Sequence, residues 1–114
     1  MKVVVLGAGT AGRFLIEEIK RVSKYIEIVG VLDNKITGEY MGIPICRPDV
    51  FLKEHKDVEA AFIAAGAQKT VGYFVELLRY YGIDNIYMLH DIAGKNMISP
   101  FDAEGKIKGE YLRR

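Results

Sequence analysis

Three glycines near the N-terminus have the spacing of a phosphate-binding turn. Gly7, Gly9 and Gly12 follow an apolar run and open a segment with helical periodicity. In this setting the first glycine permits a tight turn, the second lets the backbone approach a diphosphate, and the third lets the helix pack close to the strand. The N–H groups at the start of the helix add a positive dipole end. The spacing therefore predicts a site for the phosphates of a nucleotide, with a turn that binds no ligand as the alternative.

An acidic residue follows this turn at the spacing of a ribose contact. Asp33 lies 21 residues after Gly12, at the predicted end of the second strand. A carboxylate at this place accepts hydrogen bonds from a ribose hydroxyl and favours NAD over NADP, because it repels a 2′-phosphate. Asp33 and Asn34 also favour turns, so a turn without a ligand is the alternative.

Two polar side chains at the start of the helix each allow two interpretations. Thr10 either donates its hydroxyl to a phosphate or caps the helix. Arg13 places a cation in the first helical turn, where the helix dipole disfavours it. A bound phosphate or sugar would offset that cost; otherwise Arg13 is an ordinary exposed arginine.

Two later loops are expected at the same edge of the fold. The loop 65–68 has small residues that leave room for a cofactor, and Gln68 offers an amide to a base or ribose; a simple helix-start turn is the alternative. His90, beside Asp91, acts as a general base or lies in a surface turn. The residues predicted to bind the cofactor are Gly7, Ala8, Gly9, Thr10, Ala11, Gly12, Arg13, Asp33, Asn34, Ala65, Gly66 and Gln68.

Apolar runs alternate with helical patterns along the chain. Strands are predicted over residues 2–6, 26–32, 43–45, 60–64 and 85–89, and helices over 11–22, 48–55 and 69–81, with a polar segment over 35–42. This alternation indicates parallel pairing through right-handed crossovers. The predicted fold class is α/β: one small Rossmann-like doubly wound parallel sheet of order 3-2-1-4-5, with a short C-terminal extension. Pro44 favours an edge or a strand-start position for the third strand.

Length and composition limit the classes of protein. The 114 residues suit one nucleotide-binding domain over 1–92, followed by an extension or hairpin over 93–114 that could begin a linker to a missing domain. The net charge of +1 gives no basic excess, so no nucleic-acid partner is expected. The single cysteine and the lack of zinc-ligand spacing predict no metal and a cytoplasmic setting. The longest apolar stretch, 60–67, is too short to span a bilayer, and no membrane contact is expected.

Three runs carry a resemblance to known bacterial proteins. They are VVVLGAGTAGR over 3–13, VGVLDN over 29–34 and GIPI over 42–45. Together they are similar to the N-terminal Rossmann domains, CoA-binding-like or NAD-binding, of polysaccharide-biosynthesis nucleotide-sugar dehydratases and epimerases. The pattern also resembles the small N-terminal domain of amino-sugar acetyltransferases and, more loosely, the redox-sensing Rex repressors, whose DNA-binding head has no counterpart here. The resemblance covers about residues 2–90.

The resembled families imply different ligands. The dehydratase-like pattern implies NAD(H) or a related nucleotide on Gly7, Gly9, Gly12 and Asp33, whereas the acetyltransferase-like pattern implies a UDP-sugar. CoA is a further possible ligand. The chain lacks the hexapeptide repeats of an acetyltransferase and the Tyr-x-x-x-Lys pair of a short-chain dehydrogenase. Neither acetyl transfer nor self-contained dehydration is therefore expected of this chain.

These observations predict a nucleotide-binding Rossmann module for NAD(H) from a protein of nucleotide-sugar or polysaccharide metabolism. An adjoining domain, or another subunit in a homo-oligomer, would supply the chemistry. One alternative is the UDP-sugar-binding module of a sugar acyltransferase, and another is a redox- or ligand-sensing regulatory domain. A third is a small NAD-dependent oxidoreductase completed at an oligomer interface, with His90 as its base.

Overall fold

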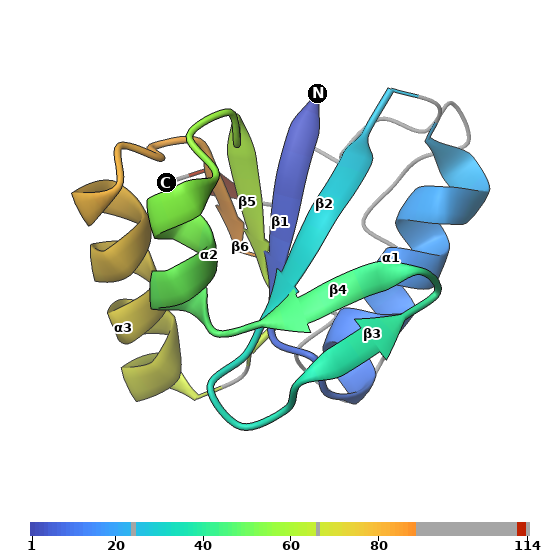
Figure 1. Cartoon of the computed structure of the whole chain (residues 1–114), viewed down its shortest axis with the longest axis horizontal. Coiled ribbons are helices and arrows are strands. Elements are labelled where there is room, and N and C mark those ends of the chain that lie inside the picture. The colour runs from blue at the N-terminus through green and yellow to red at the C-terminus, as the bar shows by residue number, and fades with distance from the viewer. Residues whose placement is uncertain (24, 66, 89–111, 114) are drawn as a thin grey trace.

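Strands and helices alternate from the N-terminus onward, and they assemble into one sheet with helices on both faces (Figure 1). The structure, a computed structural model, describes residues 1–23, 25–65, 67–88 and 112–113. The elements are β1 (Lys2–Leu6), α1 (Thr10–Val22), β2 (Glu27–Leu32), β3 (Gly38–Tyr40), β4 (Ile43–Cys46), α2 (Pro48–Glu54), β5 (Ala60–Ile63), α3 (Gln68–Tyr80), β6 (Ile86–Met88) and β7 (Leu112–Arg113).

The sheet confirms the predicted topology and adds two strands to it. Within the described residues the order is β3-β4-β2-β1-β5-β6-β7. The five strands from β4 to β6 pair in parallel and correspond to the predicted order 3-2-1-4-5. The added strands β3 and β7 pair antiparallel with β4 and β6 at the two edges. Since β3 covers β4, the edge position that Pro44 favoured is wrong; Pro44 is the second residue of β4.

The core has two layers, one on each face of the sheet. Successive residues of β1 point to opposite faces, so all of Val3 to Leu6 is buried, as expected for a parallel strand covered on both sides. On one face α1 packs against Val3 and Val5; on the other, α2 and α3 pack against Val4 and Leu6. The helical residues buried in these two layers include Leu15, Ile16, Ile19, Phe51, Leu52, Phe74 and Leu78.

A glycine inside β2 allows α2 to approach the sheet. A Cβ atom on Gly30 would lie 2.7 Å from two ring atoms of Phe51, a distance that real Cβ atoms do not show. The Phe51 ring in turn stacks on His55, with the ring centroids 3.8 Å apart. Close packing of Phe51 over the β2 backbone therefore depends on the missing side chain at Gly30.

The predicted C-terminal extension lies almost entirely outside the described residues. Of the segment 93–114, the structure describes only the backbone of Leu112–Arg113, which pairs with Tyr87 and Met88. The division of the chain at residue 92 therefore stays a prediction. No helix in the described part of the chain is long and apolar enough to cross a membrane.

Candidate functional site

The fold itself requires two of the three glycines in the turn. Gly7 has a φ of +112°, and a Cβ there would lie 2.7 Å from the carbonyl oxygen of Ala64 at the end of β5. A Cβ on Gly12 would overlap the carbonyl oxygen of Gly7. Helix α1 therefore rests directly on the turn, and side chains at these two positions would push helix and strand apart.

Packing does not explain the third glycine. Gly9 is the N-cap of α1 with a φ of −80°, a conformation open to any residue. A Cβ atom on Gly9 would meet no atom within 4 Å. Its backbone faces open space at the start of the helix, which is what the close approach of a ligand requires.

The first turn of α1 keeps its backbone donors available. No side chain caps this helix, and its first turn contains no acidic residue. Thr10, for which a capping role was one alternative, is the exposed first residue of the helix, and Gly9 takes the cap position. The N–H groups at this end therefore lack an intrahelical partner and point toward the carboxyl edge of the sheet.

Asp33 joins the end of β2 to the glycine turn. Its Oδ2 accepts a hydrogen bond from the Ala8 amide at 2.9 Å, and its Oδ1 accepts from the Lys35 and Ile36 amides at 2.8 and 3.0 Å. Burial raises the pKa of Asp33, but the three amide hydrogen bonds outweigh it, so the net pKa lies below its ordinary value. A carboxylate has about four acceptor positions, so one remains for a ligand hydroxyl.

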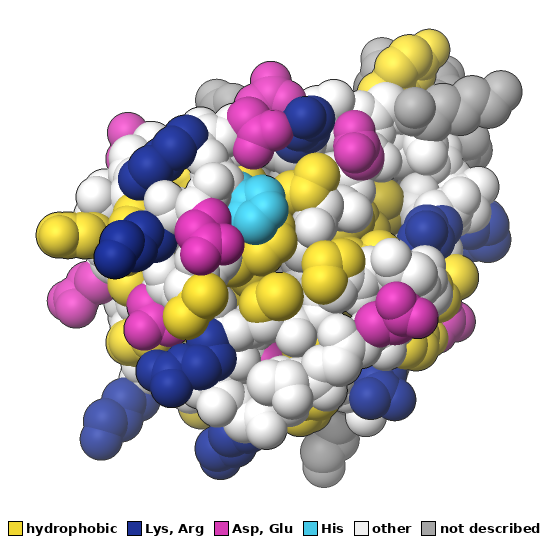
Figure 2. Space-filling model, in the orientation of Figure 1, with side chains coloured by type: hydrophobic (Ala, Val, Ile, Leu, Met, Phe, Trp, Pro, Cys, Tyr) yellow, Lys and Arg dark blue, Asp and Glu magenta, His cyan; other side chains and the backbone are white. Residues whose placement is uncertain are grey.

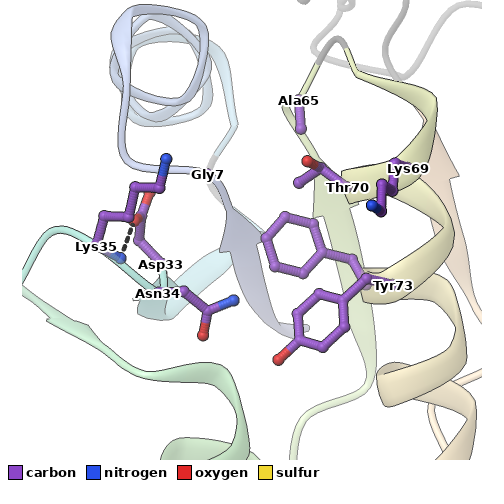
Figure 3. Close-up of a pocket in the computed structure, with 9 residues that line it drawn as sticks. Gly7, Asp33, Asn34, Lys35, Ala65, Lys69, Thr70 and Tyr73 are labelled. Atoms are coloured by element: carbon purple, nitrogen blue, oxygen red, sulfur yellow. Dashed lines mark hydrogen bonds between the residues drawn. The ribbon is translucent and has the colours of Figure 1, made fainter.

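A cavity of about 520 Å³ opens beside Asp33. Figure 3 shows its two sides: Asp33, Asn34 and Lys35 project from the loop after β2, and α3 forms the opposite side. The side chains of Asn34 and Tyr73 both project into the space between these sides (Figure 3). The residues that line the cavity are Gly7, Asp33, Asn34, Lys35, Ala65, Lys69, Thr70, Tyr73 and Phe74.

The lining combines aromatic surface with charges of both signs. Phe74 is buried, whereas Tyr73 is 42% exposed and its ring faces the cavity. The lining also includes the acidic Asp33 and the basic residues Lys35 and Lys69. This arrangement suits a flat apolar group, a sugar hydroxyl and an anionic group in one ligand.

The predicted site residues fall into three groups. Gly7, Asp33, Asn34 and Ala65 line the cavity together, and their role in binding a cofactor stays a prediction. The segment 8–13 lies at the turn and the start of α1, outside the cavity lining, and Gln68 is the exposed first residue of α3, also outside it. Gly66 and His90 lie outside the described residues. The cavity also contains five residues that the sequence did not indicate, namely Lys35, Lys69, Thr70, Tyr73 and Phe74.

Arg13 is held against the glycine turn. Its Nε donates a hydrogen bond to the carbonyl oxygen of Ala8 at 3.2 Å, and its guanidinium carbon lies 5.2 Å from the centroid of the Tyr40 ring. The Tyr40 hydroxyl donates a hydrogen bond to Glu17 Oε2 at 2.5 Å. Strand β3, which the sequence did not indicate, therefore contributes Tyr40 to the surroundings of the turn.

Comparisons with known proteins support this architecture through structure alone. No family model matches the chain, and no curated protein matches its sequence. RSP, a Rex-family repressor, superposes with a TM-score of 0.69 at 12% identity over 79% of this chain and 45% of that chain. UDP-D-quinovosamine 4-dehydrogenase from Vibrio fischeri superposes with a TM-score of 0.68 at 21% identity over 99% of this chain and 92% of that chain.

A third structure is RSP in complex with β-NAD⁺ and operator DNA. Its TM-score is 0.67 at 12% identity, over 96% of this chain and 47% of the repressor chain. The chain thus spans less than half of the repressor and most of the dehydrogenase chain. At these identities the likeness establishes the fold, a small Rossmann-like α/β domain. Operator DNA is a ligand of that repressor. In this chain, on the face seen in Figure 2, the Lys and Arg side chains lie among Asp and Glu side chains.

Proposed function

We propose that this chain is a nucleotide-binding Rossmann module whose ligand is NAD(H). The main support for this proposal is the glycine at position 9. Neither packing nor backbone conformation requires a glycine there, so the lack of a side chain is explained by a ligand close to the backbone. The uncapped N-terminus of α1 offers donors to the diphosphate at the same place.

The cavity suits the adenosine half of such a ligand. The ionised Asp33 would accept a ribose hydroxyl at its remaining acceptor position. The adenine would enter the cavity between Asn34 and the aromatic wall of Tyr73 and Phe74. The Rex-family neighbour whose structure contains β-NAD⁺ supports a ligand of this class.

The residues that line the proposed site would bind and orient a nucleotide. The described part of the chain includes no group of side chains arranged to act on a substrate. NAD(H), when bound, supplies hydride transfer, and this chain contributes the turn, the carboxylate and the aromatic wall that position it. We therefore place the chain in a protein of nucleotide-sugar or polysaccharide metabolism, where another domain or subunit acts on the substrate. The likeness to a UDP-sugar dehydrogenase over 99% of the chain supports this context.

A regulatory role is the second candidate. The superposition on a Rex-family repressor, with a TM-score of 0.69, favours a domain that senses NAD(H) and changes a subunit contact. Sedimentation with and without NADH separates the two roles. An association state that changes with NADH supports sensing, whereas an unchanged state supports the module that serves a catalytic domain.

Titration tests the proposed ligand directly. NADH binding is followed by nicotinamide fluorescence, and NAD⁺, NADP⁺, a UDP-sugar and CoA are compared by calorimetry. We expect NADH or NAD⁺ to bind more tightly than the others. Tighter binding of the UDP-sugar or CoA would replace NAD(H) as the ligand, and no binding of any of them at millimolar concentration would overturn the proposal.

A further inference from the structure

Arg13 and Asp33 hold the same residue of the glycine turn from two sides. The Ala8 amide donates to Asp33, and the Ala8 carbonyl oxygen accepts from Arg13 Nε at 3.2 Å. The guanidinium group therefore lies against the turn over which the diphosphate is proposed to run. The hydrogen bond to the Ala8 backbone restrains the position of the guanidinium group.

The aromatic residue of the edge strand adds a second restraint. The Tyr40 ring lies under the guanidinium group of Arg13, 5.2 Å from its central carbon, at a distance typical of a cation–π contact. The Tyr40 hydroxyl is bonded to Glu17, which follows Arg13 by one helical turn on α1. Tyr40 thus contacts two side chains on the same face of α1.

The same contact leaves the guanidinium group available. Glu17, four residues after Arg13, is the usual position for an ion-pair partner on a helix, but its Oε2 accepts the Tyr40 hydroxyl. Among the described residues, no ion pair with Arg13 is found, and its hydrogen bond to the Ala8 carbonyl uses only Nε. The two terminal nitrogens keep the planar donor geometry that binds two oxygens of an oxyanion.

We propose that Arg13 binds a phosphate group of the nucleotide and that Tyr40 positions it for this contact. The inference rests on the proposed nucleotide-binding function and adds a phosphate contact outside the glycine backbone. The shared chemistry is a phosphate oxyanion, which is supplied by the diphosphate common to all dinucleotides or by the 2′-phosphate of NADP⁺. Tyr40 acts through Arg13 and has no contact with the ligand of its own.

The first experiment compares Arg13→Gln with Lys20→Gln by titration with NADH and NADPH. Lys20 is exposed on the last turn of α1, so the two variants share a helix and a change of charge. Because Arg13→Gln loses a charged hydrogen-bond donor, we expect it to bind roughly tenfold more weakly than the wild type, whereas Lys20→Gln should bind as the wild type does. An equal loss for both ligands indicates the diphosphate, and a loss confined to NADPH indicates the 2′-phosphate. Added salt should weaken nucleotide binding by the wild type more than binding by Arg13→Gln.

The second experiment tests whether Tyr40 acts through Arg13. Tyr40→Phe keeps the ring, and Tyr40→Leu removes it. We expect the Leu variant to bind NADH more weakly than the Phe variant, and the double variant Arg13→Gln/Tyr40→Leu to bind no more weakly than Arg13→Gln. If the two losses add in the double variant, Tyr40 is not a positioning residue for Arg13, and that part of the proposal is overturned.

The outcomes separate this inference from the function on which it rests. If the wild type binds NADH and Arg13→Gln binds as tightly as Lys20→Gln, Arg13 does not bind phosphate and the nucleotide-binding function stands. If the wild type binds no nucleotide, both proposals are overturned. Circular dichroism of each variant verifies that the fold is retained, as expected for the exposed side chain of Arg13.

Discussion

The Ala8 amide donates a hydrogen bond to Asp33 Oδ2 at 2.9 Å, across 25 residues of sequence. This contact joins the turn after β1 to the loop after β2. The proposed phosphate and ribose sites are therefore held at a fixed spacing by the chain itself. A ligand that spans both sites meets a preorganised surface, which lowers the entropic cost of binding.

The first prediction concerns Asp33 and pH. Asp33→Asn lacks the negative charge that the three amides stabilise. At pH 7 its free energy of unfolding should be lower than that of the wild type by about 1 kcal/mol, a small value because Asp33 is partly exposed to solvent. Because the folded pKa of Asp33 lies below its unfolded value of about 3.9, the carboxylate stabilises the fold above that pH. The advantage of the wild type should shrink as the pH falls below about 4.

Urea unfolding of both proteins at pH 7 and at pH 3 measures this effect. A difference that stays constant between the two pH values would show that the amide hydrogen bonds do not stabilise the ionised form. Lys35 follows Asp33 by two residues, and its charge also lowers the Asp33 pKa, so Lys35→Gln serves as a control for that smaller contribution.

The second prediction separates two glycines by their effects on folding and binding. Gly9→Ala should change the free energy of unfolding by less than about 1 kcal/mol, because the added Cβ meets no neighbour, while NADH affinity falls at least roughly tenfold. Gly12→Ala should destabilise the fold by about 3 kcal/mol or more, because its Cβ overlaps the Gly7 carbonyl oxygen. Urea denaturation measures the stability of the two variants, and NADH titration measures their affinity. Unchanged affinity in Gly9→Ala would remove this turn from the binding site.

The third prediction tests the aromatic wall of the cavity. Tyr73→Ala removes a ring that faces the proposed adenine position and should weaken NADH binding roughly three- to tenfold. Tyr80→Ala is the matched control, because Tyr80 lies on the same helix, is 81% exposed and does not line the cavity. Equal affinities of the two variants would place the base elsewhere.

The fourth prediction concerns the contact between Gly30 and Phe51. Gly30→Ala places a Cβ 2.7 Å from the Phe51 ring and should lower the free energy of unfolding by about 2 kcal/mol. Phe51→Leu in the same chain makes room for the new methyl group, so the double variant should lose less stability than the sum of the single losses. Urea denaturation of the three variants measures this coupling, and strict additivity would contradict the proposed steric conflict.

The fifth prediction concerns the turn between β3 and β4. Met41 and Gly42 connect these strands with φ values of +52° and +80°, a combination that favours Asn-Gly. Met41→Asn should raise the free energy of unfolding by about 0.5 kcal/mol, because asparagine tolerates the left-handed conformation better. Met41→Ala keeps the unfavourable conformation and should bring no gain. A thermal melt that ranks alanine above asparagine would rule out backbone strain at this turn.

The sequence predicted the parts of the fold whose causes are local. The apolar runs at Lys2–Leu6 and Ala60–Ile63 are buried on both faces, and this burial gives them a pattern that a single chain reveals. The helical periodicity of residues 69–81 likewise predicted α3, whose buried residues are Phe74, Val75 and Leu78. The glycine spacing and Asp33 indicated the carboxyl edge as well, because a turn of this kind depends on residue types at fixed positions.

The parts that could not be predicted depend on tertiary contacts. Strand β3 contains Gly38, Glu39 and Tyr40, which are exposed or half-buried and show no apolar alternation; its extended form comes from pairing with β4. Lys69 and Tyr73 look like ordinary exposed helical residues, and only the placement of α3 beside the loop after β2 brings them to the cavity. The role of Tyr40 beside Arg13 depends on the same unpredicted strand.

Strand β3 also affects how the sheet behaves toward other chains. Without it, β4 would present an open row of backbone donors and acceptors next to the buried Ile43 and Ile45. Such edges recruit strands from other molecules and lead to aggregation. With only three residues, two of them exposed, β3 covers this row and leaves little backbone for further strand addition. The hairpin that brings Tyr40 to Arg13 thus protects the same side of the domain from intermolecular growth of the sheet.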